Sequence, residues 1–147
     1  MIKFESEEKK QLVMDCLEEN MNEEYRATLQ YICHRISAQG KNSMLAEAFK
    51  TAALDEMAHI LFFSDMITKL GGDPVFKDWK IDKSTDLETM LQKDIQLEKD
   101  SIIRYSDQLE KLKEYPELHA IVEGVLSDEE DHRDTFADFM KRIIPEK

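Results

Sequence analysis

The sequence predicts an all-α protein, a bundle of four long helices with one long crossover between the second and the third. Only 4 Gly and 3 Pro occur among the 147 residues, and residues that favour helices are frequent. Apolar residues recur every three or four positions through four segments, as on the buried face of a helix. Gly or Pro separates these segments. A chain of this length forms one core, so we expect residues 1–147 to be a single domain.

The first two segments predict an antiparallel helical hairpin. One helix covers residues 6–38, with Ser6 at its start and Gly40 just beyond its end. The next covers residues 43–70, where Ser43 and Glu47 resemble a capping arrangement and Gly71 marks the stop. The connection between them is short, so the two helices are expected to run in opposite directions.

Residues 71–83 show no helical period and predict an extended connection, anchored by Phe76 and Trp79. Thirteen extended residues reach about 43 Å, which matches the length of about 42 Å expected for a 28-residue helix. The segment can therefore return along the whole bundle. The second and third helices are then parallel to each other.

The last two segments predict a second hairpin. One helix covers residues 84–114, opened by Ser84, and the other covers residues 117–143. Pro116 separates them, and Pro145 ends the second. Gly124, inside the last helix, suggests a close helix approach or a kink.

Two Asp-Glu-x-x-His motifs, at 55–59 and 128–132, carry the chemistry. A Glu and a His three residues apart lie on one face of a helix. Glu56, His59, Glu129 and His132 all occupy positions of the apolar stripes that should face the core. An unpaired buried carboxylate costs several kcal/mol, so a cation is expected beside these acids.

The two hairpins also repeat each other. Glu24 and Tyr31 in the first correspond to Glu98 and Tyr105 in the second, at the same spacing of seven residues. Glu24 and Glu98 are 74 residues apart, and the two motif glutamates are 73 apart. An internal duplication about a pseudo-twofold axis would bring both sets of acids and histidines to the middle of the bundle.

Four carboxylates and two imidazoles suit two first-row metal ions, with open positions left for O₂, peroxide or water. We predict Glu24 and Glu98 as terminal ligands and Glu56 and Glu129 as bridges, with one histidine on each metal, His59 and His132. Carboxylate-rich sites favour iron, with manganese as the alternative. The competing interpretation is a metal-free bundle with buried Glu–His or Glu–Lys pairs, which is disfavoured because no Lys or Arg shares the predicted central layer.

These motifs resemble the ferritin-like di-iron carboxylate superfamily, and bacterioferritin most of all, over residues 12–140. Gln30-Tyr31-x-x-His34 and Asp94-x-x-x-Glu98 add to the resemblance. It implies a ferritin-like bundle that oxidises Fe(II) with O₂ or hydrogen peroxide in iron homeostasis. The alternatives are a rubrerythrin-like peroxide-reducing oxidoreductase with an unidentified electron donor, a non-catalytic iron-binding or storage protein, and a di-metal enzyme acting on an organic substrate.

The sequence departs from these relatives in two ways. Rubrerythrin-type proteins carry a further carboxylate where this sequence has Ser101, and a Cys-rich module with C-x-x-C motifs that is not found here. Ferritin cages use a short fifth helix, whereas fifteen residues follow His132. A homodimer is therefore expected, with a larger assembly as the alternative.

Further residues have roles that the pattern suggests. Tyr31 and Tyr105 are expected to hydrogen-bond a bridging carboxylate or to supply an electron, with core packing as the alternative. Met57 is expected to pack in a helix or subunit interface, with haem ligation as the alternative that the resemblance implies. Asp94 and Asn20, one turn before the terminal ligands, are candidate acceptors for the outer N–H groups of the ligating histidines.

Composition excludes some partners. A net charge of −12 disfavours nucleic acid and anionic membrane surfaces. No apolar run is long enough for a membrane span or a signal segment, so a cytoplasmic protein is expected. Cys16 and Cys33 are expected to be buried free thiols. His34 and His119 are expected at the surface or in packing roles, with a peripheral iron site near His34 as the alternative.

Overall fold

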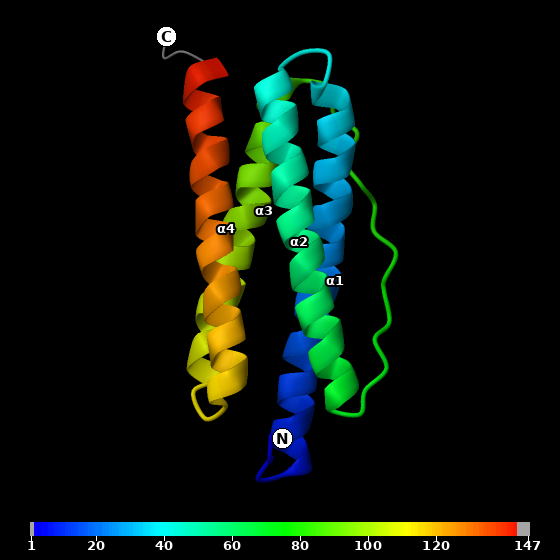
Figure 1. Ribbon diagram of the computed structural model, residues 1–147, viewed down its shortest axis with the longest axis vertical. Helices are drawn as coiled ribbons and strands as arrows, with labels where there is room; N and C mark the ends of the chain where they lie inside the picture. Colours follow the sequence, from blue (N-terminus) through cyan, green and yellow to red (C-terminus); the bar gives the residue numbers. More distant parts are fainter. Residues whose placement is uncertain (1, 144–147) are drawn as a thin grey trace.

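The computed structural model describes residues 2–143 and contains four helices (Figure 1). They are α1 (Glu7–Ala38), α2 (Ser43–Lys69), α3 (Leu87–Lys111) and α4 (Pro116–Ile143). No strand occurs within the described residues. The predicted all-α class is confirmed.

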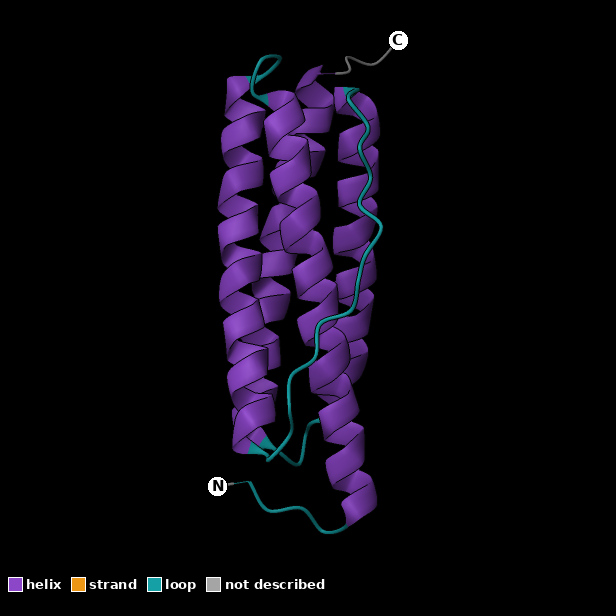
Figure 2. Ribbon diagram, turned by 90° about the vertical axis from the view of Figure 1, so that its right-hand side faces the viewer, coloured by secondary structure: helices purple, strands orange, loops and turns teal. Residues whose placement is uncertain are grey.

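The helices form two antiparallel hairpins. α1 packs mainly against α2 and α3 mainly against α4, while α1–α3 and α2–α4 contacts join the hairpins. Residues 70–86 run back along the outside of the bundle, as two views at right angles show (Figure 1, Figure 2). α2 and α3 therefore run in the same direction, which confirms the predicted crossover.

Local capping explains where the helices begin. Ser6 accepts a hydrogen bond from the Lys9 amide at the start of α1, as predicted. α2 is capped by Asn42 rather than by the predicted Ser43 arrangement. α3 begins three residues later than predicted because the Asp86 carboxylate accepts from the Thr89 amide. The remaining differences are that α3 ends at Lys111, before the predicted 114, and that Pro116 is the first residue of α4.

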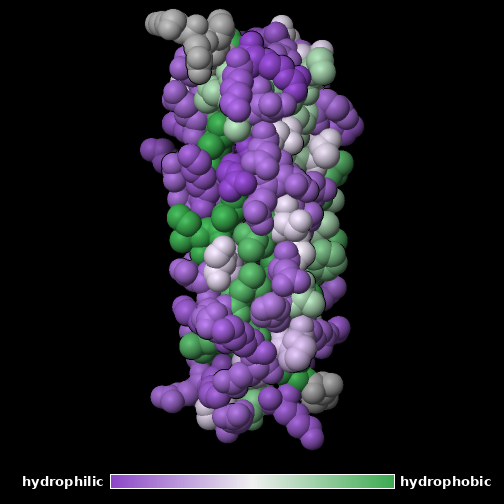
Figure 3. All heavy atoms as spheres, turned by 90° about the vertical axis from the view of Figure 1, so that its left-hand side faces the viewer, coloured by the Kyte–Doolittle hydropathy of each residue, from purple (hydrophilic) through white to green (hydrophobic). Residues whose placement is uncertain are grey.

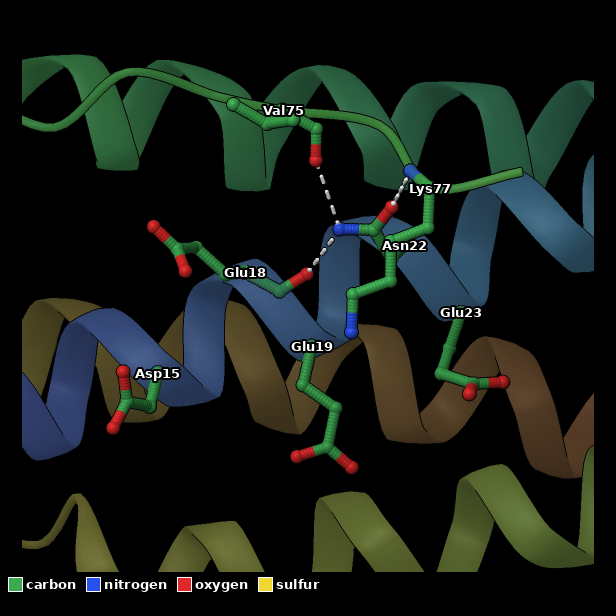
Figure 4. A pocket seen from close by; sticks show the side chains of 7 residues that line it. All are labelled: Asp15, Glu18, Glu19, Asn22, Glu23, Val75 and Lys77. Carbon is green, nitrogen blue, oxygen red and sulfur yellow. Dashed lines mark hydrogen bonds between the residues drawn. The ribbon is translucent and has the colours of Figure 1, made fainter. Parts of the chain in front are cut away.

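Two amide side chains of α1 hold the crossover against the bundle. The Asn22 amide donates to the Val75 carbonyl and accepts from the Lys77 N–H (Figure 4). Two turns later, Gln30 donates to the carbonyl of Asp82 and accepts from its N–H, both at 2.8 Å. Backbone groups that an extended segment leaves unpaired are thus satisfied by α1.

Aromatic contacts also anchor the crossover, as predicted. Phe76 packs against Tyr25, with ring centroids 4.8 Å apart. The Arg26 guanidinium lies over the Trp79 ring at 5.1 Å from its centroid. The groove between α1 and the crossover is lined mostly by acidic side chains (Figure 4): Asp15, Glu18, Glu19, Asn22, Glu23, Val75 and Lys77.

The apolar core is divided into two clusters, one toward each end of the bundle. The first includes Val13, Leu17, Phe63, Ile67, Leu112, Leu118 and Val122. The second includes Ala38, Leu45, Phe49, Met90, Leu91 and Phe136. Between them, all four helices place buried polar side chains in one layer. This polar layer interrupts the core at its middle, as the sequence pattern predicted.

The outer surface is largely hydrophilic, in keeping with the net charge of −12, although hydrophobic groups form a column at mid-height on the face drawn in Figure 3. No described helix is long and apolar enough to cross a membrane. Cys16 and Cys33 are free and only partly buried. The expectation of a close approach at Gly124 is wrong, because a Cβ added there would meet no atom within 4 Å.

Candidate metal centre

The six residues predicted as metal ligands come together in the polar layer. Each is at most 7% exposed, and the four helices all contribute: Glu24, Glu56, His59, Glu98, Glu129 and His132. They form two groups whose donor atoms lie within 4.8 Å of one another. One group contains Glu24 and His59, the other contains Glu98 and His132, and both share Glu56 and Glu129. Two groups with two shared glutamates suit two metal ions, and the terminal and bridging roles stay a prediction.

Each histidine directs Nδ1 toward the carboxylates. His59 Nδ1 lies 3.3 Å from Glu24 Oε2 and 3.5 Å from an oxygen of both shared glutamates. His132 Nδ1 lies 3.3 Å from Glu56, 3.4 Å from Glu98 and 3.8 Å from Glu129. Every shared glutamate therefore approaches both imidazoles, and each terminal glutamate approaches one.

Many of these buried atoms have no hydrogen-bond partner among the described residues. They are both carboxylate oxygens of Glu56, both of Glu129, Oε2 of Glu98 and Nδ1 of His132. The histidine contacts of these shared glutamates lie within ion-pair distance but lack the geometry of a hydrogen bond. Burying several carboxylate oxygens and an imidazole nitrogen together without partners costs free energy unless a cation binds them. The side chains present therefore fit metal ions.

The same environment shifts the pKa values of the group. Burial, and then the negative charges of the other glutamates, raise the pKa of Glu56 well above its usual value and that of Glu129 to about 7. Burial opposes the charge on His59, but its close contacts with the carboxylates of Glu129 and Glu24 raise its pKa to about 11. Burial likewise opposes the charge on His132, and Glu98 raises its pKa to about 9. Without metal, the cluster holds protons that metal ions would displace.

The outer nitrogens of the histidines contact carboxylates that the sequence analysis missed. His59 Nε2 lies 2.7 Å from Asp128 Oδ2, and His132 Nε2 lies 2.8 Å from Asp55 Oδ2. Each Asp of an Asp-Glu-x-x-His motif thus holds the histidine of the other motif. The available signal was the Asp that precedes the Glu in both copies.

The predicted acceptors, Asp94 and Asn20, do not contact these histidines, and that prediction is wrong. Asp94 binds His34, with 2.6 Å between Oδ2 and Nδ1. Asn20 pairs with Gln108. His34 is fully buried, which agrees with a packing role and not with a place at the surface, the two that were expected. Its two nitrogens face different carboxylates, so the alternative of a peripheral iron site there is not supported by the geometry.

The two tyrosines bind terminal glutamates across the bundle, not the bridging ones that were predicted. Tyr31 donates to Glu98, and Tyr105 donates to Glu24. Burial, followed by the charge of the acceptor, raises the pKa of each phenol well above its usual value. Arg104 lies over the Tyr105 ring at 4.7 Å, so a cation does come near this layer, contrary to the sequence-based expectation.

Comparison with known proteins gives the family. The sequence model of the ferritin-like domain family matches residues 14–144 of this chain. The chain belongs to the ferritin-like domain family. A comparison with curated protein sequences gave no match.

Solved structures of ferritin-like proteins share the fold. The bacterioferritin of Desulfovibrio desulfuricans, whose di-iron site was studied in different catalytic states, is 26% identical with a TM-score of 0.86, over 92% of this chain and 82% of that one. A di-iron carboxylate protein of Bacillus anthracis is 24% identical, with a TM-score of 0.85 over 92% and 99%. A dodecameric thioferritin of Bacteroides fragilis is 21% identical, with a TM-score of 0.85 over 91% and 87%. The carboxylate and histidine cluster fits a di-iron site.

Two grooves reach the outer side of this ferritin-like centre. One, of about 470 Å³, lies beside His59 and is lined by Phe62, Ala120, Ile121, Gly124, Val125 and Asp128. The other, of about 230 Å³, lies beside His132 and is lined by Met44, Glu47, Ala48, Thr51, Ala52, Thr135 and Phe136. Both lie between α2 and α4. The histidines therefore separate the buried carboxylates from these two openings.

Met57 does not point into the ferritin-like centre. It is 47% exposed, and Leu54 and Leu61, on the preceding and following turns of α2, are exposed as well.

Proposed function

We propose that the protein binds two iron ions in the polar layer and oxidises Fe(II) with O₂ or hydrogen peroxide. The observation that carries this proposal is the set of six buried ligand-type residues whose inward oxygens lack other partners. The bacterioferritin of Desulfovibrio desulfuricans, with its di-iron site, supports iron rather than manganese.

In this proposal, Glu56 and Glu129 would be shared by the two ions, Glu24 and His59 would hold one ion, and Glu98 and His132 would hold the other. Carboxylates bind Fe(II) and Fe(III), and six protein ligands for two ions leave coordination positions open. Two Fe(II) supply the two electrons that, with two protons, reduce hydrogen peroxide to two water molecules.

The surroundings of the centre suit this role. The acidic chain attracts cations, and grooves beside His59 and His132 bring solvent to the outer side of both histidines. Tyr31 and Tyr105 donate to the terminal carboxylates and hold the side chains that bind only one metal. They are also the side chains we propose as internal electron donors.

The test compares the native chain with Glu56→Ala after two Fe(II) per chain are added without oxygen. Absorbance of oxidised iron is then followed after mixing with O₂ or with peroxide, and a chelator assay counts the remaining Fe(II). The native chain should oxidise both ions, and the variant should lose most of the rate. Glu130→Gln, on the exposed side of α4, is the charge-changing control. An unchanged rate in Glu56→Ala would refute the proposal.

The alternatives give different results in the same experiment. Peroxide reduction of the rubrerythrin type requires many turnovers with an added electron donor. Storage without turnover predicts bound iron with no consumption of oxidant. A single round of oxidation followed by release or retention of Fe(III) supports the proposal as stated.

We also propose that the chain forms a homodimer through the outer face of α2. Leu54, Met57 and Leu61 form an exposed apolar stripe there, and burying it against a second copy would remove it from water. Haem bound at Met57 is the alternative use of this face. Light scattering measures the assembly, and Met57→Lys should shift it to monomer. Haem absorbance that Met57→Leu abolishes would support the haem alternative.

A further inference from the structure

The duplicated hairpins differ at one buried layer next to the centre. In each half of the repeat, the residue four positions before the terminal glutamate forms a pair across the bundle. Its partner is the residue ten positions after the terminal glutamate of the other half. In one half the pair is Asn20 with Gln108, and in the other it is Asp94 with His34. These positions correspond through the repeat, since 94 − 20 = 74 and 108 − 34 = 74. Equivalent sites therefore hold an uncharged pair and an ionisable pair.

The uncharged pair closes on itself. Asn20 donates to Gln108 Oε1 at 2.7 Å, and Gln108 donates back to Asn20 Oδ1 at 2.8 Å. Both side chains are buried, and Arg104 Nε donates to the same Asn20 oxygen. An amide pair fills this position in the bundle, so packing alone does not require an acid and an imidazole.

The ionisable pair continues outward to the crossover. His34 Nδ1 lies 2.6 Å from Asp94 Oδ2, and His34 Nε2 lies 3.1 Å from Asp82 Oδ2. His34 and Asp94 are fully buried, whereas the Asp82 side chain is 22% exposed and also meets Lys93 Nζ at 2.6 Å. A continuous hydrogen-bonded chain thus runs from the surface into the bundle.

Both tautomers of His34 have partners. With the proton on Nε2, the ring donates to Asp82, and Nδ1 accepts from the Asp94 carboxyl when that group is protonated. With the proton on Nδ1, it donates to Asp94, and Nε2 accepts from the Gln30 amide nitrogen at 2.9 Å. A ring that is satisfied in both forms can take a proton on one nitrogen and give one up from the other.

The inner end of the chain lies one turn of α3 before Glu98, a residue of the candidate metal centre. Asp94 Oδ1 and Glu98 Oε2 are buried without a hydrogen-bond partner among the described residues. They belong to successive turns of α3, about 5–6 Å apart at their Cβ atoms. A water molecule that hydrogen-bonds both oxygens would complete the chain as far as Glu98. Burial raises the pKa of Asp94 to about 6 against the effect of His34, which suits proton exchange near neutral pH.

We propose that Asp94, His34 and Asp82 form a proton path between the Glu98 half of the metal centre and solvent at the crossover. The proposal rests on the proposed function, because binding of two cations displaces protons from the buried cluster. A proton that leaves the cluster is taken by Asp94 and passed to His34 Nδ1. The proton on Nε2 then leaves for Asp82 and water, so one proton has moved from the cluster to solvent and the ring is left in its Nδ1–H tautomer, in which Nε2 accepts from Gln30. No electron moves in these steps.

The test replaces the ionisable pair by the amide pair that the other half of the bundle carries, and we call this double variant the graft. The double variant His34→Gln with Asp94→Asn places the Asn20–Gln108 chemistry in the ionisable half. The probe is Co²⁺, whose binding is followed by its absorbance while a pH-indicator dye reports proton release in stopped flow. We expect the same stoichiometry and equilibrium affinity as the native chain, with binding and proton release at least tenfold slower. A positioning role would instead lower the equilibrium affinity.

The matched control is the reverse exchange, Asn20→Asp with Gln108→His, which should leave both rates within about twofold of native. Three results would each overturn the proposal. They are equal slowing in the two double variants, an unchanged rate in the graft, and a loss of affinity that matches the loss of rate. Where the graft does not fold, Asp82→Asn at the outer end must show the slowing, and an unchanged rate there also overturns it. A native chain that binds no Co²⁺ would instead contradict the proposed function, and the proton path would fall with it.

Discussion

The contact between Asp128 and His59 gives a prediction that the structure makes quantitative. Asp128→Asn keeps the size of the side chain but removes the charge that faces His59 Nε2 at 2.7 Å. A carboxylate on the outer nitrogen fixes the ring and raises its basicity, and its loss typically weakens metal binding about 10- to 100-fold. The Asp128 side chain is 50% exposed, so solvent screens the charge and we expect the lower end, about tenfold or about 1.4 kcal/mol.

The loss should be confined to one of the two metal ions, because Asp128 contacts only the histidine of the Glu24 half. A titration with Co²⁺ should therefore show one site of native affinity and one weakened site. Asp131→Asn makes the same charge change at an exposed position of the same helix and serves as the control. Equal affinities in the two variants, or equal weakening of both sites, would refute the reasoning.

Three further predictions concern pH, the tyrosines and the glycines. The pKa values of Glu129 and His132 are raised to about 7 and about 9 in the folded metal-free chain. From about pH 4.5 to 9 the folded chain therefore holds more protons than the unfolded chain, so its free energy of unfolding should fall as pH rises. Metal affinity should rise about tenfold per pH unit for each proton displaced. Calorimetry at pH 6 and 8, with and without metal, measures both the stability and the affinity. A metal-free melting temperature that increases from pH 6 to 8 would contradict the prediction for stability. Tyr105→Phe removes the donor to Glu24 and should reduce stability by about 1 kcal/mol in chemical unfolding, with no loss expected if that bond is absent in solution. Gly124→Ala should stabilise the chain by about 1 kcal/mol because the site is open and helical, whereas Gly71→Ala should destabilise it by about 1 kcal/mol because Gly71 has φ of 86°. Chemical unfolding of both variants measures the two changes, and the opposite order would refute the reasoning.

The polar layer could be predicted because it follows from helical periodicity alone. Glu56 and His59 occupy positions between Ala52 and Phe63 in a stripe that must face the interior, and the same holds for the second motif. The match between the two hairpins then indicated that the layer is shared. The length of residues 71–83 indicated the crossover, and therefore the parallel direction of α2 and α3.

The hydrogen bonds across the bundle could not be predicted in the same way. Asp94 was expected to serve a ligating histidine because it lies one turn before Glu98, but it meets His34 instead. The carboxylate that does hold His59 is Asp128, on a different helix. Both cases depend on the axial offset between helices, and the spacing within a helix contains no information about that offset.

The order of residues along each helix was sufficient to establish which side chains face inward, how the hairpins repeat, and which six of them meet at mid-bundle, because a helix of 3.6 residues per turn fixes directions locally. Partner choice among those inward groups arises only when four helices and the crossover pack together. The depth and register of that packing bring Asp55 and Asp128 to the opposite histidines and enclose His34 between Asp82 and Asp94, since these contacts join residues that are 48 to 77 positions apart.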